Sequence, residues 1–468
     1  MQICTIIHTI IVIKYIVVID VVGLELNHIY SGLVPNIANV AAEGESTRME
    51  PVFPALTCPV QTSILSGKYP NQHGIIANGL YDRDNYVTSF WEQSSALVQT
   101  DRIWDKVKKR QQQNKSSNSL SPSLQSFKTG VLFWQNTMYA KSDIVVTPRP
   151  LHMEDRMIMW CYSKPTGFYD TELKERFGEF NLATYWGPFA SNKSSEWIAK
   201  ATEYTLEKKR PDLLLTYIPH IDYSAQRFGK NSNQVRDDLK KADELVGNII
   251  KKSVELGIKD KTQFIILSEY GFNDVRTTIP LNLKFRDEGL LHTRTIHGKE
   301  YIDYEFSSAF AMVDHQIAHI YVKEGFAERA RNVLQNTTGI DKILSSEGKR
   351  KLKIDHEHSG ELIAISDKDK WFSYYWWYDS EMSPVFAKTV DIHRKPGYDP
   401  VELFIDPKTN SIPLDPQLVK GSHGRPADPL TEEGYSVYIS NRKSDNLKSN
   451  SPSINCTSVG QYLNSVIT

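Results

Sequence analysis

Three short apolar runs, each followed closely by an acidic residue, constrain the fold of this chain more than any other feature. They span residues 15–20, 213–218 and 264–268. Short apolar runs between helical patterns are typical of buried strands in an α/β sheet. Asp20 ends the first run, Asp222 lies just past the second, and Glu269 directly follows the third. Because ligands bind beyond the carboxyl ends of parallel strands, we expect these acids to converge at one sheet edge if the three strands are neighbours.

The segments between these runs have the periodicity of helices. We predict helices over residues 35–44, 104–110, 194–208 and 234–256, and a further strand over 130–134. The fold class is therefore α/β, with a mostly parallel central sheet flanked by helices. Paired carboxylates at a sheet edge usually hold divalent cations, although three unrelated polar strand ends are the alternative.

The stretch over residues 51–82 carries a candidate nucleophile. Thr57 precedes a proline and a helical run that stops at Gly67, the pattern of an N-cap, a helix and a C-terminal glycine. A hydroxyl at that point lies among unpaired backbone N–H groups, which favour anions. Beside a metal ion it can act as a nucleophile, whereas without one Thr57 is an ordinary cap. The residues by themselves leave both interpretations open.

This stretch resembles the nucleophile segment of the nucleotide pyrophosphatase/phosphodiesterase family, within the alkaline phosphatase superfamily. The resemblance rests on three motifs in the family's order: Pro54–Thr57, Ser66–Ile75 and Asn78–Asp82. It implies an alkaline phosphatase-like fold and a threonine, here Thr57, that attacks phosphorus. The family usually has Asn three residues after this threonine to bind a phosphate oxygen. This chain has Val60 there, and Gln61 can supply a substrate-binding amide instead.

The resemblance also implies a set of metal ligands. It carries four positions over as metal or nucleophile positions: Asp20, Thr57, Asp222 and His423. Three further ligands are changed, because Gln226 and Tyr270 replace histidines and Glu269 replaces an aspartate. The loss of two imidazoles removes the nitrogen donors that zinc prefers. We therefore expect divalent metal ions, with manganese or magnesium favoured over zinc.

Other histidines can compensate for the two that are missing. His220 comes two residues before Asp222, at the end of a predicted strand, and is our first choice as a replacement ligand. The alternatives lie later in the chain: His315, His319 and His393.

Changes in pattern divide the chain into segments. We expect a catalytic core over residues 1–276, an inserted α+β cap over 277–384, a return to the core over 385–440 and a flexible Ser/Asn-rich tail over 441–468. Within that tail a last short helix from Val459 is an open alternative. Aromatic residues are dense over 371–378, which favours packing within the cap over a surface that stacks a flat group.

Composition narrows the partners and the compartment. A formal net charge of −1 over 468 residues argues against a nucleic-acid polymer as ligand. The four scattered cysteines form neither a disulfide framework nor a metal-ligand spacing, which predicts free thiols in a reducing, cytoplasmic compartment. The apolar run over residues 3–13 is too short to cross a bilayer and lacks a signal-peptide pattern, so no stable membrane insertion is expected. An extra strand or a misplaced start codon explains this run, and a membrane anchor is the alternative.

Together these features predict a metal-dependent hydrolase of phosphoesters. It would cleave phosphodiester or pyrophosphate bonds of a phosphorylated small molecule through a phosphothreonine intermediate. The changed ligands leave two alternatives open: a phosphate-ligand binding protein of the same fold with weak or no turnover, and a phosphotransferase whose acceptor is not water. The sequence indicates neither the natural substrate nor the oligomeric state.

Overall fold

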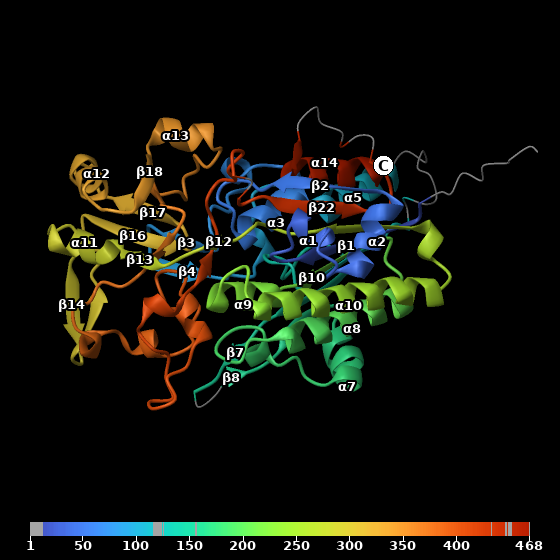
Figure 1. The fold of residues 1–468 in the computed structure, drawn as a ribbon, viewed down its shortest axis with the longest axis horizontal. Helices are drawn as coiled ribbons and strands as arrows, with labels where there is room; N and C mark the ends of the chain where they lie inside the picture. Colours follow the sequence, from blue (N-terminus) through green and yellow to red (C-terminus); the bar gives the residue numbers. More distant parts are fainter. Residues whose placement is uncertain are drawn as a thin grey trace, which may run out of the picture.

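A nine-stranded sheet forms the centre of the molecule (Figure 1). The computed structural model describes residues 13–115, 124, 126–154, 157–431, 433–444, 447 and 452–467. The strands, in the order in which they pair, are β23 (Ser453–Asn455), β2 (Glu45–Glu50), β22 (Ser436–Ser440), β11 (Thr262–Leu267), β1 (Tyr15–Val21), β10 (Leu213–Ile218), β5 (Thr129–Leu132), β6 (Ile144–Pro148) and β9 (Cys161–Lys164). β22 is antiparallel to both of its neighbours, β9 is antiparallel to β6, and the other pairs are parallel. The predicted fold class is thereby confirmed.

The three strands that precede the acidic residues are neighbours. β1 lies between β11 and β10 and is parallel to both, with Asp20 opposite Leu267 on one side and Tyr217 on the other. β10 and β11 are buried along their whole length, and β1 is buried except at its first residue. Continuous burial requires an apolar run on both faces, which is the pattern that the sequence shows. The shared direction of the three strands brings their carboxyl ends to one edge.

Helices cover both faces of the sheet (Figure 1). One group, in which α10 contacts each of the other helices, consists of α2 (Pro35–Glu43), α8 (Asn192–Lys208), α9 (His220–Phe228) and α10 (Asn233–Glu255). The other group consists of α3 (Thr57–Ser66), α5 (Ile103–Lys115) and α14 (Cys456–Val466), and in it α14 contacts both α3 and α5. The predicted helices are present, and the one expected over residues 104–110 continues to Lys115.

The end of the chain differs from the flexible tail expected over residues 441–468. Residues 453–455 form β23, which pairs with β2 at the edge of the central sheet. α14 follows directly and buries Cys456, Val459 and Leu463 against the core. The last short helix expected from Val459 is present and begins at Cys456, whereas the strand before it was not expected in so Ser/Asn-rich a segment.

A second, four-stranded antiparallel sheet lies at the left of Figure 1, within the stretch proposed as the cap (277–384). Its strands are β16 (Ala309–Asp314), β17 (Ile317–Val322), β19 (Leu362–Ser366) and β18 (Ile340–Leu344). Three helices accompany it: α11 (Leu281–Asp287), α12 (Ala327–Gln335) and α13 (Ser346–Lys351). The aromatic run packs inside this region, since Phe372, Tyr374 and Trp376 are buried.

Shorter elements complete the structure. They are α1 (Leu26–Ile29), α4 (Pro70–His73), α7 (Lys174–Phe177), β3 (Gly79–Asp82), β4 (Val87–Phe90), β7 (Leu151–His152), β8 (Met157–Ile158), β12 (Asn273–Asp274), β13 (Thr277–Pro280), β14 (Thr293–Ile296), β15 (Lys299–Ile302), β20 (Lys370–Ser373) and β21 (Gly421–Ser422).

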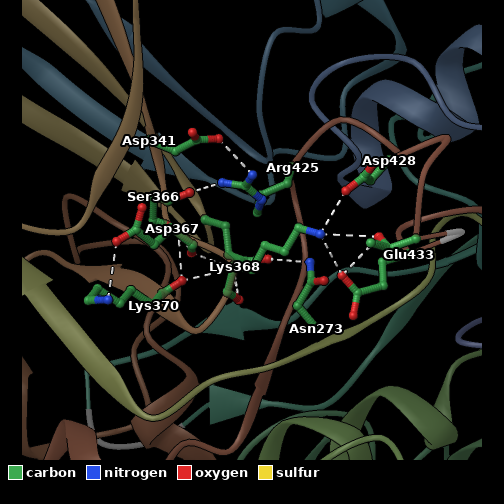
Figure 2. A network of polar contacts seen from close by, with 11 residues as sticks. Asn273, Asp341, Ser366, Asp367, Lys368, Lys370, Arg425, Asp428 and Glu433 are labelled. Carbon is green, nitrogen blue, oxygen red and sulfur yellow. Dashed lines mark hydrogen bonds and ion pairs between the residues drawn. The ribbon is translucent and has the colours of Figure 1, made fainter.

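Ion pairs join the cap to the segment that follows it in the core (Figure 2). Lys368 of the cap reaches Asp428 at 2.7 Å and Glu433 at 3.0 Å. Arg425 extends in the other direction and pairs with Asp341 at 2.7 Å. The proposed cap and the segment after it thus each contribute a basic and an acidic side chain to these ion pairs.

Two expectations from composition concern the termini and the thiols. Cys58, Cys161 and Cys456 are free and buried, as predicted for them, whereas Cys4 lies outside the described residues. Residues 1–12, most of the N-terminal apolar run, also lie outside them. In the part of the chain that the structure describes, no helix combines the length and the apolar composition needed to span a bilayer.

Candidate active site

Thr57 is the first residue of α3, and the residue in the N-cap position is Leu56. This corrects the expectation that Thr57 itself caps the helix. Its hydroxyl lies 3.0 Å from the hydroxyl of Tyr270, and either of the two groups can be the donor. The helix ends as predicted at Gly67, which adopts a left-handed conformation with φ 70°. α3 thus presents the threonine side chain to the carboxyl edge of the sheet instead of using it to close the helix.

Asp20 and Glu269 form a buried carboxylate pair bridged by Gln61. The Gln61 amide nitrogen donates to Glu269 Oε1 at 2.6 Å and to Asp20 Oδ2 at 3.2 Å. The backbone N–H of Gln135 donates to Gln61 Oε1 at 2.7 Å, which fixes the orientation of the amide. Gln61 lies one turn after Thr57 on α3, so the helix supplies both the candidate nucleophile and the bridge.

Burial raises the pKa of both carboxyl groups of this pair. The pKa of Asp20 is raised to about 7, and hydrogen bonds only partly counteract the loss of water. The pKa of Glu269 is also raised, first by burial and then by the charge of Asp20, and the Thr57 side chain counteracts this shift. One oxygen of each group, Asp20 Oδ1 and Glu269 Oε2, is buried with no hydrogen-bond partner. The pair is therefore suited to hold a proton or a cation.

Helix α9 supplies the second half of the site. It presents Asp222 and Gln226 on the same face, one turn apart, and the Gln226 amide nitrogen donates to Asp222 Oδ2 at 2.7 Å. The Gln226 oxygen accepts a hydrogen bond from the Tyr398 hydroxyl at 2.9 Å. Burial, and then the charge of Glu269, raises the pKa of Asp222 to about 8. Asp222 Oδ1 has no hydrogen-bond partner and lies 3.9 Å from His423 Nε2.

Stacked rings close the site from the side of the cap. Tyr270 stacks on His423 with ring centroids 3.5 Å apart and an interplanar angle of 9°. His315, at the tip of the β16–β17 hairpin, lies 3.8 Å from His423 and stacks on Tyr398 at 3.7 Å. The His423 Nδ1–H donates to the Ala55 carbonyl oxygen at 2.8 Å, which turns Nε2 toward Asp222.

The structure brings most of the predicted residues together, but not His220. Both ring nitrogens of His220 are engaged elsewhere, with Ser195 of α8 at 2.8 Å and with the Asp238 carbonyl oxygen of α10 at 3.0 Å. Of the other candidate replacements, His319 binds the Ile76 carbonyl oxygen and His393 binds the Phe90 carbonyl oxygen. His315 is the one that reaches the site.

Sequence reasoning gave no role to three residues that line this region. The Asn78 side chain accepts a hydrogen bond from the Cys58 N–H at the start of α3. Asn78 donates in turn to Asp314, whose other partner is His315. Tyr398 links Gln226 to His315. Asn78 is the first residue of the Asn78–Asp82 motif, so the family resemblance could have indicated a role for it. Asp314 and Tyr398 are brought to the site by tertiary contacts, which no sequence motif marks.

The donor set suits one cation that prefers oxygen ligands better than it suits zinc. Two carboxylates with unpartnered oxygens, Asp20 and Glu269, lie beside the Thr57 hydroxyl and suit a cation that prefers oxygen. The second position is weaker, because Gln226 turns its N–H toward Asp222 and its oxygen toward Tyr398. Burial raises the pKa of Tyr270 further above its usual value, so the phenol stays neutral and is a poor ligand. Among the described residues, no three His, Cys, Asp or Glu ligand atoms converge here.

Comparison with known proteins gives a consistent family. The family model for type I phosphodiesterase / nucleotide pyrophosphatase matches residues 16–399. An uncharacterised pyrophosphatase/phosphodiesterase of Schizosaccharomyces pombe is 24% identical over 263 residues, which cover 55% of this chain and 44% of the relative. Ectonucleotide pyrophosphatase/phosphodiesterase family member 1 of Mus musculus is 26% identical over 252 residues, which cover 53% of this chain and 22% of the relative. The bis(5'-adenosyl)-triphosphatase of Mus musculus is 25% identical over 261 residues, covering 53% and 45%. The chain spans less than half the length of each of these relatives.

Solved structures share the fold over nearly the whole chain. An inactive variant of murine ectonucleotide pyrophosphatase / phosphodiesterase 5 in complex with AMP has a TM-score of 0.60 at 14% identity, covering 97% of this chain and 95% of its own. Phosphonoacetate hydrolase from Sinorhizobium meliloti 1021 in complex with phosphonoformate has a TM-score of 0.60 at 15% identity, covering 98% and 96%. At such identities the likeness is one of fold.

Proposed function

Since the chain belongs to the type I phosphodiesterase / nucleotide pyrophosphatase family, we propose that it hydrolyses phosphodiester or pyrophosphate bonds of a phosphorylated small molecule, with Thr57 as nucleophile. The observation that carries this proposal is the position of the Thr57 hydroxyl. It lies at the N-terminal end of a buried helix and next to the Tyr270 hydroxyl. It also interacts with the Glu269 carboxyl, whose pKa it lowers. A helix N-terminus favours the negative charge of a phosphoryl group.

The residues around Thr57 can handle the proton of the reaction. Tyr270 stays neutral and can donate to Thr57 Oγ1, which directs the Thr57 hydrogen toward Glu269. Burial and the charge of Asp20 make Glu269 a stronger base than a solvated carboxylate. In the proposed sequence ionised Glu269 takes the Thr57 proton as Thr57 Oγ1 attacks phosphorus and the bond from phosphorus to the leaving oxygen breaks. The proton then passes to that oxygen, which releases an alcohol or a phosphate. Water then cleaves the Thr57–phosphate bond.

We further propose that Asp20, Thr57 and Glu269 hold one divalent cation, with Asp222 and His423 as a weaker second set. The oxygen donors favour manganese or magnesium over zinc. When bound, such a cation would lower the pKa of the Thr57 hydroxyl and neutralise phosphate charge. Gln61 would keep the two carboxylates oriented through its bridging hydrogen bonds.

One observation supports the alternative of a phosphate-ligand binding protein with weak or no turnover. Gln61 and Gln226 direct amide N–H groups at Asp20, Glu269 and Asp222. These hydrogen bonds satisfy some of the carboxylate oxygens that cations would otherwise bind. A site stabilised in this way can keep its shape and its phosphate pocket without metal.

An assay of mono- and diesters of nitrophenyl phosphate, with magnesium, manganese, zinc or no added metal, separates the two functions. Wild-type protein should hydrolyse a diester, and Thr57→Ala should lose this activity while Thr57→Ser retains part of it. Thr57→Ala should lower the stability by only about 1 kcal/mol, because it removes one buried hydrogen bond, with the Tyr270 hydroxyl. Full activity in Thr57→Ala would refute the assignment. Binding of AMP by wild-type protein without turnover of any ester would favour the alternative.

A further inference from the structure

A cluster of metal-binding side chains lies outside the Thr57 site, in the loop between α13 and β19. It consists of His356, Glu357 and His358, and one ligand atom from each lies within 4.8 Å of the other two. Within the described ranges of the chain it is the one group of three such donors that converge. Both imidazoles are half-buried and Glu357 is exposed, so ions in solution can reach them.

Each of the two imidazole rings has one nitrogen within hydrogen-bond distance of an oxygen atom of the core. His356 Nε2 lies 3.0 Å from Gln99 Oε1, and His358 Nδ1 lies 2.9 Å from the Gly74 carbonyl oxygen. A ring nitrogen that faces an oxygen acceptor carries the hydrogen, which leaves a lone pair on the other nitrogen. The two lone pairs therefore reside on His356 Nδ1 and His358 Nε2. Metal-ligating histidines almost always have such an acceptor behind the ring, because it fixes the tautomer and the ring orientation.

From this arrangement we propose that His356, Glu357 and His358 bind a divalent transition-metal ion. Two imidazoles and one carboxylate supply three protein ligands and leave room for water, a set that suits zinc, cobalt or nickel better than calcium or magnesium. The cation would displace the weak hydrogen bond of 3.2 Å that His356 Nδ1 now accepts from the His358 N–H. Bonds of about 2.0–2.2 Å require the donors to approach one another, which the exposed Glu357 side chain can do by rotation.

The loop that carries this cluster lies within the proposed cap and makes hydrogen bonds with the core. Besides the two ring contacts, the Asn71 N–H donates to the Lys353 carbonyl oxygen at 3.0 Å, and the Asn71 side chain donates to Asp355 at 3.0 Å. The Asp355 carboxylate adds negative charge next to the cluster. A bound cation would fix the loop against α4 and would stabilise the folded state by linkage.

Calorimetric titration of zinc and of cobalt into chelator-treated, full-length protein tests the proposal. Wild-type protein should show a binding event that Glu357→Gln and His358→Ala each weaken at least tenfold. Gln99→Leu removes the acceptor behind His356 and should weaken the same event by about 10–100-fold, although it deletes no ligand. The control is His297→Ala, which removes an exposed histidine from the turn between β14 and β15 and should bind like wild type.

This site and the Thr57 site are distinguishable. Asp222→Asn, which alters the proposed active site, should keep the binding event, and zinc should raise the melting temperature of Asp222→Asn but not that of His358→Ala. Equal stoichiometry and affinity in wild type, Glu357→Gln and His358→Ala would overturn the proposal, as would a wild-type protein whose every zinc ion is lost in Asp222→Asn.

Discussion

Near Thr57, two hydrogen-bond donors, Gln226 and Tyr270, occupy positions at which the family resemblance implies histidines. The Tyr270 hydroxyl lies within hydrogen-bond distance of the Thr57 hydroxyl, and its ring stacks on His423. Gln226 donates to Asp222. Each change removes a nitrogen lone pair and adds an O–H or N–H group at the same edge of the sheet. If the site binds a metal ion as proposed, these two residues, rather than a change of fold, are expected to lower its affinity for zinc.

Restoring the two imidazoles should restore zinc affinity. The double variant Gln226→His with Tyr270→His should bind zinc at the Thr57 site more tightly than the wild type by at least tenfold, because each position regains a nitrogen donor. Competition with a chromogenic chelator measures this, and Gln226→Asn with Tyr270→Phe is the matched control without new donors. Two tightly bound zinc ions at this site in the wild-type protein would contradict the argument.

Asp314 makes stability depend on pH. Burial raises the pKa of this carboxyl to about 7, and hydrogen bonds from Asn78 only partly counteract it. The folded protein thus holds a proton that the unfolded chain releases near pH 4, so the free energy of unfolding falls as pH rises from about 4 through about 7. The melting temperature should decrease between pH 5 and pH 8, and Asp314→Asn should reduce that slope. An unchanged slope in the variant would show that Asp314 is ionised in the folded protein.

At the scale of elements, α3 is positioned by the close approach of α14. A Cβ atom added to Gly460 would lie 2.3 Å from the Ile64 carbonyl oxygen and 2.7 Å from the Gly67 nitrogen. Both contacts are with backbone, which no side-chain rotation can relieve. α14, which lies in the segment expected to be a flexible tail with at most a last short helix, thereby sets the position of α3, the helix that begins with Thr57.

Gly460→Ala should force these two helices apart. We expect it to destabilise the protein by about 1–3 kcal/mol, as overpacking does, and to lower any esterase activity at Thr57. Denaturant unfolding measures the first effect. Gln461→Ala, at an exposed position on the same helix, is the control and should change the stability by less than about 0.5 kcal/mol. A Gly460→Ala variant as stable as the control would mean that α14 does not press on α3.

At the scale of the whole molecule, the passage from the cap back to the core is fixed by a buried cation. Lys395 lies 2.8 Å from Asp399 and 2.7 Å from Glu402, and all three side chains are at most 2% exposed. Glu402 also accepts a hydrogen bond from the Trp186 indole. The charges of the two carboxylates keep the pKa of Lys395 above its usual value despite the burial. This triad, with the Trp186 indole, fixes the segment that follows the proposed cap against the core, and the ion pairs of Figure 2 join that segment to residues 341 and 368.

Lys395→Met should be strongly destabilising. It leaves two buried carboxylates without their cation, which costs about 3–5 kcal/mol in comparable sites. Lys388→Met removes an exposed ion pair with Glu381 and should cost at most about 1 kcal/mol. Urea unfolding of both variants provides the comparison. Similar losses in the two would show that the charge of Lys395 contributes no more than a surface pair.

The sequence by itself determined four neighbouring parallel strands of the central sheet, β11, β1, β10 and β5, and most of the side chains proposed for the site. The other five strands of that sheet were not predicted. β1, β10 and β11 are buried on both faces, so apolar residues predominate in each of them and made these strands recognisable in the sequence. The acids were recognisable by their positions, with Asp20 near the end of β1 and Asp222 and Glu269 a few residues after β10 and β11. The Thr57 motif and the glycine that ends α3 depend on local backbone geometry, which neighbouring residues encode.

Only the tertiary structure decided which side chains meet across long separations. It turned His220 toward α8 and α10, brought His315 from the cap onto His423, and paired α14 with α3. Such contacts join residues that are distant in the chain, and their choice depends on packing and on which hydrogen-bond partners remain available. No local pattern records that choice, because the same histidine or glycine has the same neighbours in sequence whichever surface it finally contacts.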